Sequence, residues 1–127
     1  MSQHGMLLFA HGARDPAWAA PFEAVAERLR RLRPELQVRL AFLEFMAPTM
    51  AQAGAALAAA GCVRVEVVPL FLGAGGHVRK DVPQQMQQLQ AAHPAVRFAL
   101  HAAIGEHPDV IAAMASAAVS LADTTGL

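Results

Sequence analysis

The sequence predicts an α/β protein with a four-stranded parallel sheet. Strand-like and helix-like segments alternate along the chain, which is the pattern of βαβ units. The chain has 127 residues, enough for one domain with a core of its own. Its composition, 55% hydrophobic and 16% charged, is typical of an ordered globular protein. We therefore expect a single domain over residues 1–127, ordered from about residue 5 to residue 121.

The four predicted strands differ in their hydrophobic pattern. The first, Met6–Ala10, and the third, Val63–Leu72, are almost continuously apolar, as central strands covered on both faces are. The second, Leu36–Phe42, and the fourth, Val96–Leu100, alternate apolar and polar residues, as edge strands do. With right-handed crossovers, this pattern predicts strand order 2-1-3-4, in which the order reverses between strands 1 and 3.

The predicted helices carry recognisable start and stop signals. Asp15 can cap the first helix with Pro16 at its first position, and Pro34 ends it. Apolar residues three and four apart mark its buried stripe, while Pro21 predicts a kink or a true start nearby. We expect the other helices at Pro48 to Gly61, from about Asp81, and at Pro108 to Leu121.

Chemically active side chains follow three of the predicted strands. His11 follows the first strand, Glu44 the second, and His77 the glycine-rich turn after the third. Ligands of open α/β sheets bind outside the carboxyl ends of the strands where the strand order reverses. Neutral imidazoles bind divalent metals, and imidazole or carboxylate groups accept protons near neutral pH. These three residues form the candidate site, unless they merely cap strand ends through backbone hydrogen bonds.

The glycine-rich turn, GAGGH, favours an anionic ligand other than a nucleotide. Gly75 and Gly76 permit a sharp turn or a close approach to a ligand. The turn lacks the GK[ST] ending of a P-loop and the full GxGxxG spacing, so it does not indicate ATP use. Arg14, Arg79 and Lys80 flank the two histidines. They are either contacts for the carboxylates of a ligand or solvated loop charges.

The other histidines and the single cysteine receive structural interpretations. We expect His4 in a frayed tail, His93 and His107 at helix ends, and His101 in a solvated loop after the fourth strand. Cys62 is expected to be buried at a strand start. One cysteine excludes an internal disulfide and a cysteine-rich zinc site.

Charge and hydropathy limit the partners and the location. Ten basic residues balance ten acidic ones, so no global field attracts nucleic acid. The N-terminus has neither a basic region nor a long apolar segment, and no apolar run approaches the roughly 20 residues that span a bilayer. We expect a soluble, cytoplasmic protein without membrane partners.

Three motifs give the chain a family resemblance. They are HGARDP after the first strand, FLEFMAPT after the second and VPLFLGAGGHVRKDVP after the third. In order and spacing, from about residue 6 to residue 119, the chain resembles the short CbiX-type sirohydrochlorin chelatases of the class II chelatase superfamily. The resemblance implies a flavodoxin-like, chelatase-like fold. It also implies ATP-independent insertion of a divalent metal into sirohydrochlorin, in cobalamin or sirohaem biosynthesis.

The resemblance also assigns roles. The substrates would be sirohydrochlorin and Co²⁺, with Fe²⁺ or Ni²⁺ as other options, and no cofactor would be permanently bound. The family's two active-site histidines match His11 and His77, and an assisting acidic residue matches Glu44. Ala13 stands where the family usually has Ser, and Ala47 where an acidic residue is common. Because longer relatives close a cleft between two such domains, this chain is expected to form a homodimer.

Two alternatives belong to other functional classes. A metal or tetrapyrrole carrier would keep the fold and the binding histidines without accelerating metal insertion. A histidine phosphatase also places His-Gly after its first strand, but it needs Arg just before that histidine, where this chain has Ala10.

Overall fold

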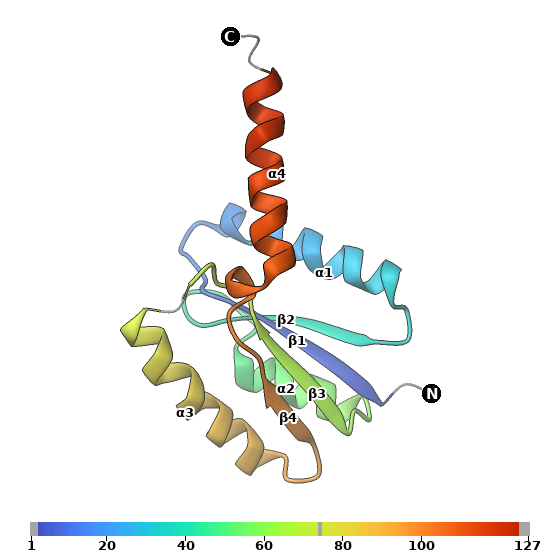
Figure 1. Ribbon diagram of the computed structural model, residues 1–127. Coiled ribbons are helices and arrows are strands. Elements are labelled where there is room, and N and C mark those ends of the chain that lie inside the picture. Colours follow the sequence, from blue (N-terminus) through green and yellow to red (C-terminus); the bar gives the residue numbers. More distant parts are fainter. Residues whose placement is uncertain (1–2, 74, 125–127) are drawn as a thin grey trace.

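The computed structural model describes residues 3–73 and 75–124 and has the predicted α/β architecture (Figure 1). One parallel sheet has the order β2-β1-β3-β4, which confirms the predicted fold class and strand order. Within the described residues, no helix combines the length and apolar character needed to cross a bilayer. The strands are β1 (His4–Ala10), β2 (Gln37–Phe42), β3 (Arg64–Pro69) and β4 (Arg97–Leu100).

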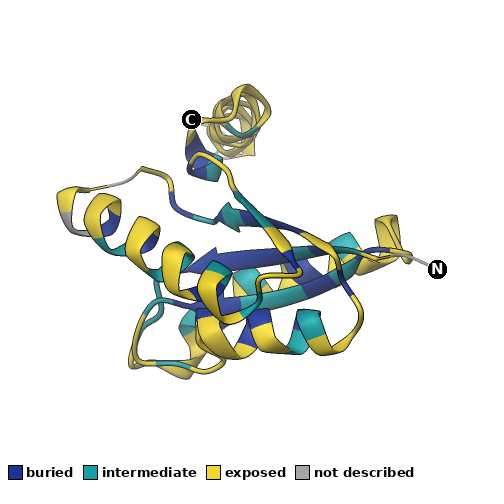
Figure 2. Ribbon diagram, turned by 90° about the horizontal axis from the view of Figure 1, so that it is seen from below, coloured by how far each residue is buried: buried dark blue, intermediate teal, exposed yellow. Residues whose placement is uncertain are grey.

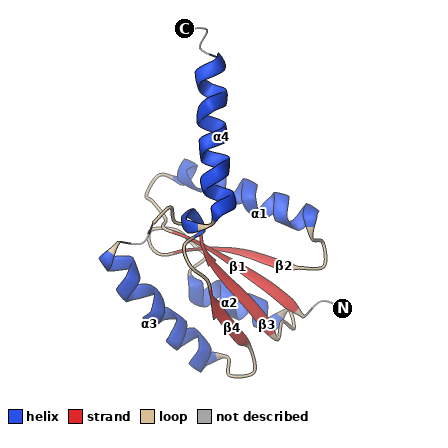
Figure 3. Cartoon of the chain, viewed as in Figure 1, coloured by secondary structure: helices blue, strands red, loops and turns tan. Residues whose placement is uncertain are grey.

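Helices flank the sheet on both faces, and one helix projects from the body of the molecule (Figure 3). Short 3-10 helices precede the first and last α-helices. The α-helices are α1 (Ala20–Leu32), α2 (Met50–Ala59), α3 (Gly76–Ala92) and α4 (Pro108–Thr124), and the 3-10 helices are η1 (Pro16–Ala19) and η2 (Ile104–Glu106).

The period-two alternation of the strands divides the core between the two faces of the sheet. Leu7 and Phe9 of β1 are fully buried in the cluster to which α2 and α3 contribute. Leu8, between them, lies in a second cluster with Ala26 of α1 and Val38 of β2. The central strand β1 is therefore covered on both faces, as its continuously apolar sequence predicts.

The capping predictions are largely confirmed. The Asp15 carboxylate accepts a hydrogen bond from the Ala17 N–H at 3.0 Å and caps η1, after which α1 begins at Ala20, next to Pro21. Helix α2 begins two residues after Pro48. Thr49 and Gln52 form a capping box there, with the Gln52 N–H donating to Thr49 Oγ1 at 3.1 Å.

The predicted start of the third helix near Asp81 is wrong. Helix α3 begins at Gly76, with Gly75 as its N-cap in an extended conformation. Val78 and Val82, one turn apart, are both buried in the core cluster under the sheet. Burial of this pair outweighs the poor helix propensity of the glycine. Strand β3 is also shorter than predicted and ends at Pro69.

A close backbone contact joins the loops that follow β1 and β2. The Leu43 N–H donates to the Ala10 carbonyl at 2.9 Å, and the Glu44 N–H donates to the His11 carbonyl at 3.1 Å. Gly12 has a φ of 93°, and a Cβ atom added there would lie 1.9 Å from the Glu44 carbonyl oxygen. Only glycine fits this position, so the His-Gly motif fixes the two loops against each other.

We expect Gly12→Ala to destabilise the protein more than Gly61→Ala. Gly61 also has a left-handed φ, 88°, but an added Cβ there meets no atom within 4 Å. Its substitution should cost about 1–2 kcal/mol for backbone strain alone. At Gly12 the displaced Glu44 loop adds to that cost. Urea unfolding of both variants measures the difference, and equal losses would show that the Glu44 loop relaxes freely.

Candidate functional site

The candidate site lies at the carboxyl edge of the sheet, where the chain leaves β1, β2 and β3. His11 directly follows β1, and its carbonyl accepts a hydrogen bond from the backbone N–H of Glu44, which follows β2. The His11 ring packs on Phe71, which follows β3, with ring centroids 5.0 Å apart. Residues from three different strand ends thus converge on His11, at the place where the strand order reverses.

His77 occupies a different kind of position from the loop that we expected. It is the second residue of α3 and therefore belongs to the first turn of a helix. Its backbone placement still brings it to the edge that follows β3. The side chain of His77 lies outside the described part of the structure. The glycine-rich turn thus leads directly into the N-terminus of α3. Unpaired N–H groups at a helix N-terminus favour anions.

The predicted basic and acidic residues line the same edge. Glu44 is exposed on the loop after β2. The guanidinium of Arg14 lies 5.0 Å from the centre of the Phe45 ring, next to Glu44, in cation–π contact. Arg79 and Lys80 are exposed in the first turns of α3, beyond Gly75 and Gly76. The described residues contain no group of three His, Cys, Asp or Glu side chains that could hold a metal.

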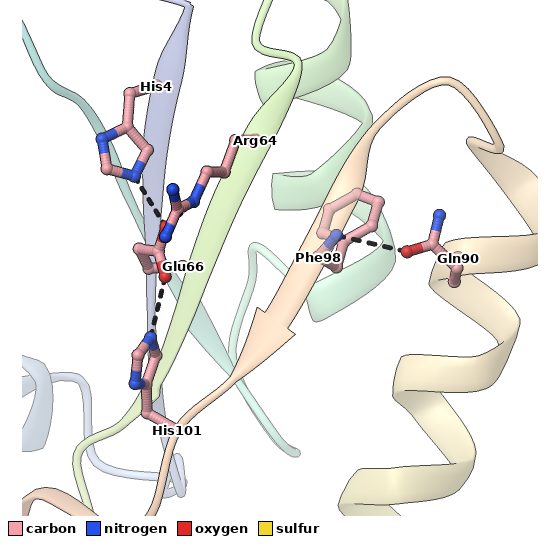
Figure 4. A network of polar contacts seen from close by, with 6 residues as sticks. All are labelled: His4, Arg64, Glu66, Gln90, Phe98 and His101. Atoms are coloured by element: carbon pink, nitrogen blue, oxygen red, sulfur yellow. Dashed lines mark hydrogen bonds and ion pairs between the residues drawn. The ribbon is translucent and has the colours of Figure 1, made fainter.

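A second polar cluster was missed by the sequence reasoning (Figure 4). The Glu66 carboxylate, on β3, is buried and accepts hydrogen bonds from His4 Nε2 at 2.7 Å, Arg64 Nε at 2.8 Å and His101 Nε2 at 2.9 Å. The expectation of a frayed His4 is therefore wrong, because His4 belongs to β1. His101 lies exposed in the loop after β4, as expected, but its ring also binds the Glu66 carboxylate. A charged residue inside an apolar strand was the signal, because a buried charge requires partners.

These contacts set the ionisation of Glu66. The hydrogen bonds from His101 and His4, together with the Arg64 charge, lower the pKa of the Glu66 carboxyl to about 2, against the opposing effect of burial. Glu66 lies within β3 rather than at its carboxyl end. The cluster therefore ties β1, β3 and the segment after β4 together.

The fold defines a class of protein: an open parallel α/β sheet with polar side chains gathered where its strand order reverses. The chain belongs to the CbiX family, whose model matches residues 5–120. A CbiX protein of Marinobacter aquaeolei superposes with a TM-score of 0.84 at 31% identity, covering 95% of this chain and 98% of that one.

Two further relatives have chelatase names. A sirohydrochlorin cobaltochelatase of Saccharolobus solfataricus is 38% identical over 80 residues, which span 63% of this chain and 61% of the relative. The structure of the sirohydrochlorin chelatase SirB of Bacillus subtilis subspecies spizizenii in complex with cobalt has a TM-score of 0.72 at 25% identity. That match covers 89% of this chain and 48% of SirB.

We expect Glu66→Gln to flatten the pH dependence of stability in acid. The native pKa of about 2 lies below that of an unfolded glutamate, about 4.3, so the unfolded state binds more protons between these values. The contribution of Glu66 is thus present above about pH 4.5 and is lost as the pH falls toward 2. Urea unfolding from pH 3 to pH 7 should show the free energies of unfolding of the wild type and the variant approaching each other as the pH falls.

Glu27→Gln is the matched control for this experiment, because Glu27 is exposed on α1 and pairs only loosely with Arg30 and Arg31, at 3.9 and 3.8 Å. It should leave the pH dependence almost unchanged. If the free energies of unfolding of Glu66→Gln and the wild type differ by the same amount at every pH, the assigned ionisation of Glu66 is contradicted.

Proposed function

We propose that this protein is a sirohydrochlorin metallochelatase that inserts a divalent metal, Co²⁺ before Fe²⁺ or Ni²⁺, without ATP. The observation that carries the proposal is the fixed position of His11. Its ring packs on Phe71, and its backbone is bonded to Glu44 at the switch point of a CbiX-family fold. The relatives named as sirohydrochlorin chelatases support the substrate and the metal.

The proposed chemistry exchanges two pyrrole protons for one metal ion. The entering M²⁺ loses its water while two ring nitrogens each lose a proton, so that two protons are released for each metal inserted. A neutral imidazole of His11 or His77 presents the metal to the ring, since imidazole nitrogen suits all three candidate metals. The other imidazole or the Glu44 carboxylate accepts the protons.

Recognition of the tetrapyrrole is proposed to depend on charge. Sirohydrochlorin bears many carboxylates around its ring. Arg14, Arg79 and Lys80, all exposed at the carboxyl edge, offer partners for them, and Gly75 and Gly76 leave the approach to the α3 N-terminus uncrowded. An added Cβ at either of these glycines meets no atom within 4 Å among the described residues.

The working unit is proposed to be a cytoplasmic homodimer. The described residues supply one carboxyl edge of one sheet, whereas a tetrapyrrole-sized ligand bound at such an edge needs protein on both of its faces. A two-fold pair of identical chains places the same surface on each side of a shared cleft.

We expect His11→Ala and His77→Ala each to lower the rate of Co²⁺ insertion by at least about 10²-fold. Loss of either imidazole removes a metal ligand or a proton acceptor. Absorbance of sirohydrochlorin mixed with Co²⁺ follows the reaction. His93→Ala, at the end of α3, is the matched control and should retain the wild-type rate. Near-normal rates in both site variants would place the site elsewhere, and tight binding without any rate enhancement in the wild type would indicate a carrier.

Glu44→Gln should slow insertion more than it weakens tetrapyrrole binding. The amide keeps the shape of the side chain but accepts no proton, so kcat should fall by on the order of 10²-fold while Kd changes little. Stopped-flow absorbance gives the rate, and fluorescence quenching gives the affinity. Glu23→Gln, an exposed change on α1, is the control. An unchanged kcat would assign Glu44 a purely structural role in the loop.

A further inference from the structure

Two large apolar side chains stay exposed at the carboxyl edge of the sheet. The strands themselves are largely buried, and exposed residues gather on the helices and loops around them (Figure 2). Phe45, in the loop after β2, is 59% exposed, and Leu72, in the loop after β3, is 70% exposed. A single exposed apolar residue needs no explanation. The backbone conformation of Phe45 and the shared position of the two residues do.

Phe45 is held in a strained conformation. Among the described residues it is the one residue other than glycine with a positive φ, 67°. A bulky side chain in this left-handed region is an outlier and costs free energy. Nearby in the loop, Leu43 and Met46 are partly buried and pack against core clusters. The strained residue is thus the one that points into solvent, so burial of its ring does not offset the strain, and strain of this kind gathers at binding sites.

Arg14 supports the Phe45 ring from the loop after β1. Its guanidinium carbon lies 5.0 Å from the ring centre, in cation–π contact. Among the described residues, the guanidinium is in contact with this ring and forms no ion pair. A planar guanidinium can stack through its face while its N–H groups donate to carboxylates in its own plane. Arg14 therefore holds the ring in place and keeps its hydrogen-bond donors available for an acidic ligand.

Leu72 is fixed by a different contact. Its neighbour Phe71 is buried and packs on the His11 ring, whereas Leu72 is exposed. The Gly105 N–H donates to the Phe71 carbonyl at 2.9 Å. A Cβ atom added at Gly105 would lie 2.1 Å from the Leu72 carbonyl oxygen, so the backbone of Leu72 lies directly against η2. The exposed position of Leu72 is therefore set by the packing of its own backbone.

The strand order places His11 between these two side chains. Strand β1 lies between β2 and β3, so the loops that carry Phe45 and Leu72 leave the sheet on either side of His11. Two strand spacings, about 10 Å, separate β2 from β3. A tetrapyrrole is a flat ring with a broad apolar face and carboxylates around its periphery. Apolar groups on both sides of a histidine, with cations at the same edge, match both parts of such a ligand.

We propose that Phe45 and Leu72 form a platform for the face of the tetrapyrrole, which places the centre of the macrocycle at His11. This inference rests on the proposed function and adds the contact that recognises the ring itself rather than its carboxylates. Phe45 stacks on the macrocycle in an offset geometry, with Arg14 on its other side. The platform favours a flat ring over a flexible polycarboxylate of equal charge.

The first test separates binding from stability. Asparagine tolerates a positive φ, so Phe45→Asn removes the ring and relieves the strain. Fluorescence titration with metal-free sirohydrochlorin should show Kd raised by about 10-fold or more, while the urea midpoint stays equal or rises. Phe45→Trp keeps an aromatic face and should keep the affinity. Leu72→Asn should also raise Kd, whereas Leu32→Asn, an equally exposed change at the end of α1, should not. A wild-type Kd in either Phe45→Asn or Leu72→Asn would overturn the platform.

The second test uses salt to distinguish the ring contact from the charge contacts. The affinity lost in Phe45→Asn should be the same factor at about 0.05 M and about 0.5 M NaCl, because an apolar contact is not screened. The affinity lost in the Arg79→Ala/Lys80→Ala variant should shrink at the higher salt. If the loss in Phe45→Asn shrinks in the same way, Phe45 acts only by holding Arg14, and the platform is wrong.

The same measurements separate the platform from the proposed activity. A wild-type protein that binds sirohydrochlorin through Phe45 and Leu72 without accelerating Co²⁺ insertion would support the platform and contradict the chelatase. A wild-type protein that inserts Co²⁺, with a tetrapyrrole affinity that neither Phe45→Asn nor Leu72→Asn changes, would contradict the platform alone.

Discussion

The close approach of Gly12 to Glu44 is the constraint on which the candidate site depends. The missing side chain allows the loop after β1 to lie directly on the loop after β2, and the backbone bond from Glu44 to His11 follows from that contact. His11 is thereby held at the edge of the sheet, with Phe71 on one side of its ring. A ligand site at this edge needs no flexible closure to bring His11 and the Glu44 loop together.

The arrangement of the sheet and its site edge could be predicted from sequence because both depend on local patterns. Continuous apolar strands mark the centre of the sheet, and strand order then decides which strand ends meet. The start of α3 could not be predicted in this way. Gly75 and Gly76 favour a turn locally, and only burial of Val78 and Val82 against the sheet extends the helix back to Gly76.

The Glu66 cluster shows a second limit, because its partners are far apart in sequence. Glu66 Oε2 accepts a hydrogen bond from His4, which is 62 residues away in the sequence, and Oε1 accepts one from His101, which is 35 residues away. Parallel pairing of β1 with β3, and the segment after β4, bring these side chains together. Two of the six histidines are thus engaged by a buried carboxylate. The sequence reasoning had set both of these histidines apart from the candidate site, but it could not name the carboxylate that binds them.

The direction of the last helix is decided at its base. Helix η2 is fixed against the loop after β3, because the Gly105 N–H donates to the Phe71 carbonyl and a Cβ at Gly105 would lie 2.1 Å from the Leu72 carbonyl oxygen. Helix α4 follows η2 after a single residue, so it leaves the sheet in the direction that this contact sets, and none of its residues is buried.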